Sequence, residues 1–176
     1  MKLHLGCGEK FIPGWTHIDV CDYPHIAIRH SVDSLPMITD SSVEVIYACH
    51  VLEHFLRRDV VRVLREWNRV LCAGGVLRVA VPDFAALAVN YLEHREMGNI
   101  HGPLMGRGDQ LYNIHHTAFD EATLTAALVE AGFRDIRRYD WRKTEHADLD
   151  DFSQSYYPHM NKESGHLLSL NMEATA

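Results

Sequence analysis

The feature that most restricts the fold of this chain is a short apolar segment that runs directly into a glycine turn. Residues 2–5 have the length of a short strand, and Gly6-Cys7-Gly8 follows them at once. Glycines at the end of a strand allow the backbone to turn sharply and to approach another group closely, because they carry no Cβ. Such a triplet alone marks only a tight turn, so its meaning depends on the segments that follow.

Strand-like and helix-like segments alternate after this turn. Residues 15–20, 25–32 and 42–49 carry β-branched and aromatic side chains that favour strands, the second of them more weakly. Residues 57–71 place apolar side chains at helical spacing, and Gly74-Gly75 predicts the end of that helix. Strands that alternate with helices are typical of a mostly parallel α/β sheet.

The second half of the chain continues the alternation. Residues 76–81 are apolar apart from Arg78, as in a strand that is buried on both faces of a parallel sheet. The other segments predict helices at 84–94 and 120–131, a loop at 97–113 and strands at 134–141 and 166–172. We therefore expect one domain, residues 1–176, with a twisted, mostly parallel sheet of about seven strands and helices on both faces.

The connection between the first two strands is unusually short. About six residues, 9–14, link the two segments, whereas a full helical crossover between parallel strands needs about a dozen or more. The first helix of the α/β pattern is therefore expected to be shortened or missing.

Three polar or glycine-rich features follow successive strands at their carboxyl ends, where open α/β sheets bind ligands. The glycine turn follows the first strand, Asp19 ends the second, and residues 50–54 leave the fourth. A carboxylate at the position of Asp19 can accept both hydroxyl hydrogens of a ribose. Position 11 is Phe, so the third glycine of the dinucleotide phosphate fingerprint is missing. The site is therefore expected to bind a nucleoside without a diphosphate.

Composition restricts the partners and the compartment. The net charge is −7 with neutral histidine, which disfavours a nucleic-acid binder. The apolar runs are far shorter than the roughly 20 residues of a membrane span, and no signal peptide is recognisable, so no membrane association is expected. The four cysteines form no CxxC pair, which indicates reduced thiols in a cytoplasmic protein.

Several segments together resemble class I S-adenosylmethionine-dependent methyltransferases. Residues 3–8 are similar to the glycine motif of that family, and residues 43–54 resemble its fourth strand with the helix that follows. Residues 64–77 resemble its "L-x-x-x-x-R-V-L-x-P-G-G-x-L" segment, and Asp83 and residues 130–133 also fit. The resemblance covers nearly the whole chain and is closest to compact predicted methyltransferases of bacteria. It implies a Rossmann-like methyltransferase fold.

The resemblance also implies a site for S-adenosylmethionine (SAM), with S-adenosylhomocysteine (SAH) as the product. The residues implied to border it follow four successive strands: Leu5, Gly6, Cys7, Gly8, Asp19, Ser31, Val32, Asp33, Cys49, His50 and Val51. The first four would line the methionine and ribose parts, Asp19 the ribose hydroxyls, and residues 31–33 the adenine. The backbone of residues 49–51 would face the methionyl amino group and the sulfonium.

The chain departs from the usual family pattern at three points. His4 stands two residues before the first glycine, where an acid is usual, and Ser31 stands at the adenine edge, where aspartate is common. The helix that usually precedes the first strand has no counterpart, because that strand begins at residue 2. These departures make cofactor binding the first inference and methyl transfer the second.

Methyl transfer from a sulfonium mainly needs in-line placement of the acceptor and exclusion of water. An oxygen acceptor usually also needs a general base, and histidine is best suited near pH 7. We rank His115 and His116 first for this role, with Tyr112 and Asp83 as supporting polar groups. Residues 146–151 are rich in aspartate but lack the glycine turn and terminal glutamate of a calcium loop, so no metal site is expected.

Three functions follow in order of preference. The first is methyl transfer from SAM to a small-molecule acceptor, with oxygen slightly favoured over nitrogen. The second is a non-catalytic subunit that binds SAM or SAH, because part of the usual lid would have to come from another chain. Such a domain is compatible with a homodimer. The third is a nicotinamide dehydrogenase, which the missing third glycine disfavours.

Overall fold

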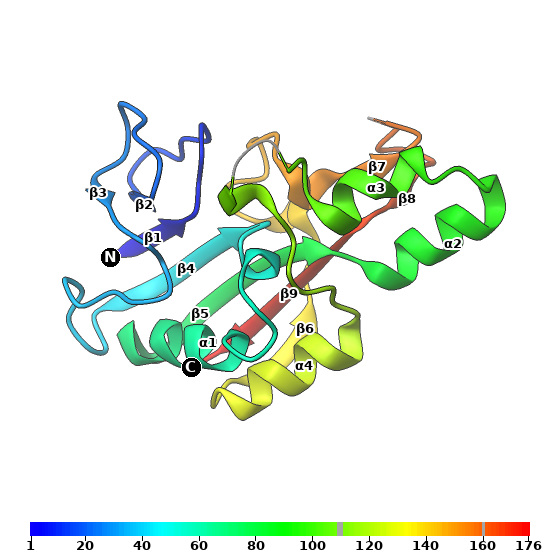
Figure 1. Cartoon of the computed structure of the whole chain (residues 1–176). Coiled ribbons are helices and arrows are strands. Elements are labelled where there is room, and N and C mark those ends of the chain that lie inside the picture. Colours follow the sequence, from blue (N-terminus) through cyan, green and yellow to red (C-terminus); the bar gives the residue numbers. More distant parts are fainter. Residues whose placement is uncertain (109–110, 160) are drawn as a thin grey trace.

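The computed structural model describes residues 1–108, 111–159 and 161–176 (Figure 1). Its central sheet contains β1 (Lys2–Leu5), β2 (Thr16–Asp19), β3 (Ile28–Arg29), β4 (Val43–Cys49), β5 (Leu71–Pro82), β6 (Arg134–Arg138) and β9 (Ser169–Thr175). A separate antiparallel pair consists of β7 (Tyr156–Tyr157) and β8 (His166–Leu167). The α-helices are α1 (Val60–Val70), α2 (Phe84–His94), α3 (Gly98–Met105) and α4 (Glu121–Glu130). Single 3-10 turns are η1 (Leu52–His54), η2 (Leu111–Asn113), η3 (Trp141–Lys143) and η4 (Phe152–Gln154).

The strand order of the seven-stranded sheet is β3-β2-β1-β4-β5-β9-β6. The first five strands in this order are parallel to one another. Strand β9 is antiparallel to both of its neighbours, β5 and β6, and lies between them in Figure 1. The prediction of an α/β fold with a mostly parallel sheet of about seven strands is therefore confirmed.

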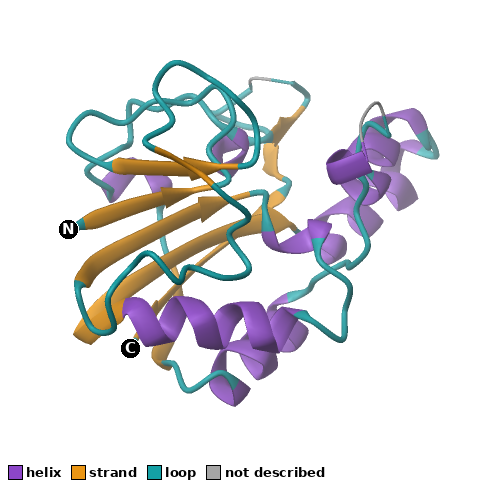
Figure 2. Ribbon diagram, turned by 60° about the vertical axis from the view of Figure 1, so that its left-hand side comes forward, coloured by secondary structure: helices purple, strands orange, loops and turns teal. Residues whose placement is uncertain are grey.

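One face of the sheet is apolar and is covered by α1 and α4 (Figure 2). Its fully buried side chains include Leu3, Leu5, Ile18, Ile46, Leu64, Leu77, Leu124 and Leu128. Trp67 of α1 is the largest of them, and its Nε1 donates to the carbonyl of Val32 at 2.8 Å. Each buried side chain of this size stabilises the fold by about 1.5–3 kcal/mol, so this layer is the main core.

The opposite face of the same strands is polar. The strand registers direct five side chains to it: His4, His17, Tyr47, Arg78 and Asn171. Residues 139–155, which include η3 and η4, cover this face, and the ring centroid of His146 lies 4.1 Å from that of Tyr47. Among the described residues, 3-10 turns and loops stand where the sequence suggests a second layer of α-helices. The connection from β1 to β2, at residues 6–15, also contains no helix, as predicted.

Two local predictions are wrong. Residues 97–113 were expected to form a loop, but α3 occupies Gly98–Met105 in spite of its glycines and Pro103. Ile100 of α3 packs with Leu87 of α2 in a second, smaller cluster, and this packing outweighs the poor helix propensity. Residues 109 and 110 of that segment lie outside the described residues.

The glycine pair Gly74-Gly75 does not stop a helix but lies inside β5, which begins at Leu71 directly after α1. Gly74 has φ +79°, and a Cβ on Gly75 would lie 2.9 Å from the carbonyl oxygen of Cys72. The pairing of β4 with β5 shifts register at this point, which is typical of a bulge with glycine. None of the described helices has the length and apolarity that a bilayer crossing requires.

Candidate functional site

The glycine turn after β1 is held against the segment that leaves β4. Gly6 and Gly8 have φ +59° and +52°, a region that favours glycine. The backbone N–H of Gly6 donates to the carbonyl of Ile18 at 2.8 Å. A Cβ on Gly6 would lie 2.5 Å from Cγ2 of Val51. Conformation and close packing therefore both require glycine at position 6, and they fix the turn at the carboxyl edge of the sheet.

Asp19 ends β2 beside this turn with a fixed carboxylate. Its Oδ2 accepts from the backbone N–H of Gly8 and its Oδ1 from that of Cys21, each at 2.8 Å. Only 6% of the residue is exposed. Each carboxylate oxygen has a second lone pair, and Asp19 lines a cavity of about 320 Å³. The side chain can therefore accept further hydrogen bonds from a ligand in this cavity.

We call this space the Asp19 cavity. It is lined by Gly6, Gly8, Asp19, Val20, Cys21, Ser31, Val32, His50, Val51, His54, Phe55, Tyr112 and Asn113. Seven of the residues that the sequence implied for SAM line it. Asp33 does not: its carboxylate accepts from Ser31 Oγ at 2.5 Å and pairs with Arg62 at 3.1 Å, and these contacts lower its pKa. Leu5 is fully buried in the core.

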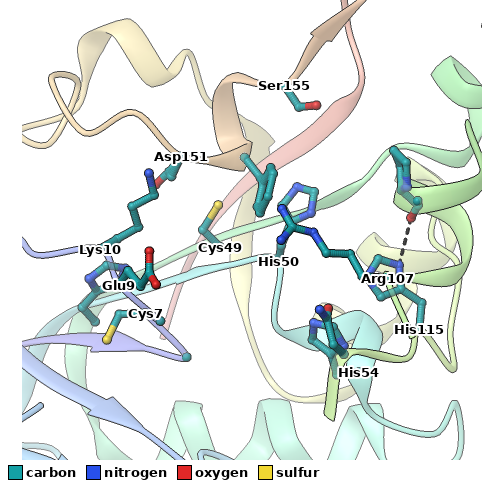
Figure 3. Close-up of a pocket in the computed structure, with 18 residues that line it drawn as sticks. Cys7, Glu9, Lys10, Cys49, His50, His54, Arg107, His115, Asp151 and Ser155 are labelled. Atoms are coloured by element: carbon teal, nitrogen blue, oxygen red, sulfur yellow. Dashed lines mark hydrogen bonds between the residues drawn. The ribbon is translucent and has the colours of Figure 1, made fainter. Parts of the chain in front are cut away.

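A larger space of about 540 Å³ adjoins the Asp19 cavity (Figure 3). We call it the histidine cavity, because four of its lining residues are His4, His50, His54 and His115. The two cavities share Gly6, Gly8, His50, His54 and Asn113, so they form one continuous cleft. Cys7 and Cys49, two further residues implied for SAM, line the histidine cavity.

The two predicted bases lie in different surroundings. His115 lines the histidine cavity, and its Nδ1 lies 2.9 Å from the carbonyl oxygen of Pro103. Burial, with His54 as a second cause, lowers the pKa of His115, so its imidazole is neutral near pH 7. His116 is exposed and lines neither cavity. The structure therefore brings one of the two histidines into the cleft.

The other polar residues proposed from the sequence have local partners. Tyr112 lines the Asp19 cavity, whereas Asp83 caps α2 by accepting from the backbone N–H of Ala85 at 3.0 Å. In the aspartate-rich segment, Asp151 accepts from the Tyr47 hydroxyl at 2.6 Å, and Asp150 pairs with a lysine at 3.1 Å. These contacts turn the side chains of the segment in different directions.

His50, directly after β4, joins the two cavities. It has φ +55°, which is uncommon for a residue with a side chain. Its Nε2 lies 3.3 Å from Ser169 Oγ, and its Nδ1 lies 3.3 Å from Oε1 of Glu53. Burial, followed by the nearby histidines 115 and 54, lowers the pKa of His50 to about 3. His50 is therefore a neutral hydrogen-bonding group in the wall of the cleft.

Glu53 and His54 of η1 belong to the segment 50–54 that the sequence placed at the edge of the sheet, but sequence reasoning gave neither of them a role. The carboxylate of Glu53 is fully buried, and neither oxygen has a hydrogen-bond partner. Its closest nitrogen contacts are His50 Nδ1 at 3.3 Å and His115 Nε2 at 4.0 Å, both without hydrogen-bond geometry. Burial raises the pKa of Glu53 to about 8. An acid followed directly by histidine after a strand is the sequence signal that points to this pair.

The sheet topology and the cleft at its carboxyl edge can be compared with those of known proteins. A mostly parallel sheet with one antiparallel strand next to its edge carries a glycine turn and a strand-ending aspartate at one cleft. Residues 3–79 match the family model for a methyltransferase domain. A search of the curated proteins found no match.

Solved structures extend the likeness beyond the matched segment. A SAM-dependent methyltransferase from Archaeoglobus fulgidus has a TM-score of 0.61 at 12% identity, covering 99% of this chain and 85% of that one. A SAM-dependent methyltransferase from Thermotoga maritima has a TM-score of 0.60 at 15% identity, with coverages of 99% and 81%. The Burkholderia thailandensis 1,6-didemethyltoxoflavin-N1-methyltransferase, crystallised with SAH, has a TM-score of 0.58 at 14% identity, covering 99% of this chain and 69% of that one. These likenesses concern the fold.

Residues 3–79 thus match a methyltransferase domain, and the chain as a whole shares the fold of SAM-dependent methyltransferases. The predictions of the enzyme class and of SAM as its cofactor are thereby confirmed. The roles of individual residues remain predictions.

Proposed function

We propose that this protein transfers the methyl group of SAM to an oxygen atom of a small-molecule acceptor. The observation that carries the proposal is the continuity of the two cavities across Gly6, His50 and His54. One cavity offers a fixed carboxylate beside a glycine turn, and the other offers neutral imidazoles. A nucleoside-containing cofactor and a polar acceptor can therefore meet at the shared wall.

The residues of the Asp19 cavity suit the nucleoside part of SAM. Asp19 is held by two backbone N–H groups and keeps free lone pairs for the two ribose hydroxyls. Ser31 and Val32 line the same cavity and would border the adenine. Gly6 packs so closely on Val51 that a Cβ would clash with it, and this packing holds the glycine turn in the wall of the cavity.

The shared wall suits the reacting end. When bound, SAM supplies a methyl group on a positively charged sulfur, which leaves with the electron pair of the carbon–sulfur bond. His115 has its Nδ1 beside a backbone carbonyl, so this nitrogen carries the hydrogen and Nε2 carries a lone pair. Nε2 can accept the proton that an acceptor hydroxyl loses as the new carbon–oxygen bond forms. This is why we favour oxygen over nitrogen as the methylated atom.

A second candidate function is a subunit that binds SAM without transferring its methyl group. It is favoured by the helix-free connection at residues 6–15, which leaves that side of the cleft to loops. One structural neighbour with a TM-score of 0.57 and 16% identity comes from a complex with the Haloferax volcanii Trm112 methyltransferase activator. A protein partner or a second copy of this chain could complete the cleft in the same sense.

Two measurements on the purified protein distinguish these functions. Isothermal titration calorimetry with SAH measures cofactor binding, and methyl-labelled SAM incubated with a small-molecule cell extract measures transfer. We expect SAH binding and a labelled product that mass spectrometry identifies as a methyl ether or ester. SAH binding without any labelled product would favour the binding subunit. Failure to bind SAH would contradict both functions.

A further inference from the structure

Two histidines of the histidine cavity and a glutamate buried behind them hold their donor atoms close together. Glu53 and His54 come from η1, and His115 comes from the segment after η2, 61 residues later. One carboxylate oxygen and one nitrogen of each ring all lie within 4.8 Å of one another. His54 and His115 approach each other in Figure 3, with ring centroids 4.9 Å apart. Among the described residues, this cluster is the one group of three or more histidine, cysteine or acidic side chains whose possible metal-ligand atoms lie this close together.

The carboxylate of Glu53 lacks the compensation that a buried charge needs. Only 1% of its side chain is exposed, and both oxygens are without hydrogen-bond partners. A carboxyl group buried in this way ionises only at a high cost unless a cation or several donors lie beside it. A metal ion held by the three donor atoms would supply the missing positive charge.

Both histidines are oriented as metal ligands usually are. His54 Nδ1 lies 3.1 Å from the carbonyl oxygen of Ile114, and His115 Nδ1 lies 2.9 Å from that of Pro103. A backbone carbonyl can only accept, so Nδ1 carries the hydrogen in each ring. The lone pair then lies on Nε2. A ring nitrogen bound to a backbone carbonyl in this way is typical of zinc-binding histidines.

We propose that Glu53, His54 and His115 bind a divalent transition-metal ion in the wall of the histidine cavity. Two imidazoles and one carboxylate suit Zn²⁺, and also Fe²⁺ or Co²⁺. Donors around one tetrahedral ion lie about 3.4 Å apart, so the side chains have to approach by about an ångström. The carboxylate is free to do so, because no hydrogen bond holds it. This proposal differs from the sequence-based expectation of no metal.

Three protein ligands leave a coordination position open, as in catalytic rather than structural zinc sites. Because His54 and His115 line the histidine cavity, we place the open position on the cavity side. An acceptor hydroxyl bound there would lose its proton to solvent water more readily, and the ion would stabilise the resulting alkoxide, so that His115 would act as a ligand and not as the base. This role rests on the proposed methyl transfer, whereas binding of the ion does not.

Cobalt provides a direct test on the full chain. Protein freed of metal with a chelator is titrated with Co²⁺, whose visible absorption reports nitrogen and oxygen ligands, and with Zn²⁺ by calorimetry. We expect one ion per chain and affinities about 100-fold lower in Glu53→Gln, His54→Ala and His115→Ala. Glu53→Gln keeps the shape of the side chain and removes only its ability to become an anionic ligand, so it should fold. His101→Ala, an exposed histidine of α3, is the matched control and should bind as the wild type does.

Two results would overturn the metal site: no stoichiometric binding by the wild type, or equal binding by Glu53→Gln and His115→Ala. Calorimetry with SAH keeps this proposal separate from the proposed function. Ion binding without SAH binding would leave the metal site standing and contradict methyl transfer. SAH binding and methyl transfer that persist unchanged after treatment with the chelator and in Glu53→Gln would support methyl transfer and contradict a part of the ion in the reaction.

Discussion

On the face of the sheet that α1 and α4 cover, the side chains are aliphatic or aromatic and are almost completely buried. On the face that residues 139–155 cover, His4 stacks on Tyr47 with ring centroids 5.3 Å apart, and Arg78 pairs with Glu173 at 2.8 Å. The same strands thus carry an apolar layer and a polar layer, separated only by the alternation of side chains. The apolar layer provides stability without ionisable groups, whereas the polar layer makes stability depend on pH.

The polar layer also continues into the cleft. His4 lies in it, and its ring also borders the histidine cavity. Burial, with the nearby His17 as the next cause, lowers the pKa of His4 to about 3. A neutral imidazole therefore stands where related methyltransferases usually carry an acid. A sheet face that is packed by polar contacts can thus supply functional groups at its edge, which an aliphatic face cannot do.

The largest expected effect is on the apolar face. Trp67→Ala removes the largest fully buried side chain and should lower the free energy of unfolding by about 3–5 kcal/mol at every pH at which the protein folds. Urea denaturation followed by circular dichroism measures this change. Leu92→Ala, at a position 58% exposed on α2, is the control and should change stability by less than about 0.5 kcal/mol. A small effect of Trp67→Ala would mean that α1 contributes little to the core.

The second prediction concerns the pH dependence that the polar layer introduces. Burial lowers the pKa of His4 to about 3 and that of His146 to about 4, from 6.5 in the unfolded chain. Between pH 6.5 and 4 the unfolded state therefore binds more protons than the folded state, and stability falls as the pH falls. Each such histidine contributes about 1.4 kcal/mol per pH unit. Above pH 6.5 this loss is absent.

His146→Phe tests the contribution of one ring. Neither nitrogen of His146 has a hydrogen-bond partner, so a phenyl ring should keep the packing against Tyr47 and retain full stability at pH 7. The slope of stability against pH near pH 5 should decrease by about 1.4 kcal/mol per pH unit. Trp67→Ala should instead lower the whole curve without changing its slope. An unchanged slope in His146→Phe would show that this ring is protonated in the folded protein.

The third prediction concerns the edge where the polar face meets the Asp19 cavity. Asp19→Asn keeps the shape of the side chain but replaces one acceptor oxygen with a donor, so SAH affinity should fall about 10- to 100-fold. Calorimetry measures the change. Asp22→Asn, with a side chain 83% exposed, should bind SAH as the wild type does. Full affinity in Asp19→Asn would contradict the placement of the ribose.

The smallest expected effect is the loss of one hydrogen bond within the polar layer. Tyr47→Phe removes the hydroxyl that donates to Asp151 Oδ2 at 2.6 Å. The half-buried carboxylate of Asp151 then has one donor fewer. Stability at pH 7 should fall by about 0.5–1.5 kcal/mol, measured by urea denaturation. A gain in stability would mean that this face is better packed by apolar groups, and the contrast between the two faces would then be weaker.

Local patterns in the sequence were sufficient to predict the parallel sheet and the turn at Gly6. A strand, a glycine and a short link to the next strand are close together in the chain, so their geometry follows from neighbouring residues. Asp19 was predicted in the same way, and the structure places it on the cleft. Its role toward a ribose still awaits measurement.

Features that depend on distant residues could not be predicted. Alternation along β1 and β4 shows that His4 and Tyr47 share a face, but not that residues 139–155 will cover it. The glycines of Gly98–Met105 disfavour a helix. The helix forms because Ile100 packs on Leu87, a contact between distant parts of the chain. The approach of His115 to η1 likewise depends on the tertiary fold, and its ligand geometry is invisible in the spacing.

The position of β9 has a consequence for biosynthesis. This strand is made after β6, yet it lies between β5 and β6 and is the link that holds β6 in the described sheet. While the ribosome has reached only as far as β6, that strand has no partner, and the exposed edge of β5 is open to other chains. The sheet closes only when Ser169–Thr175 has emerged, so the earlier segments must wait for the last strand before the domain can fold as a unit.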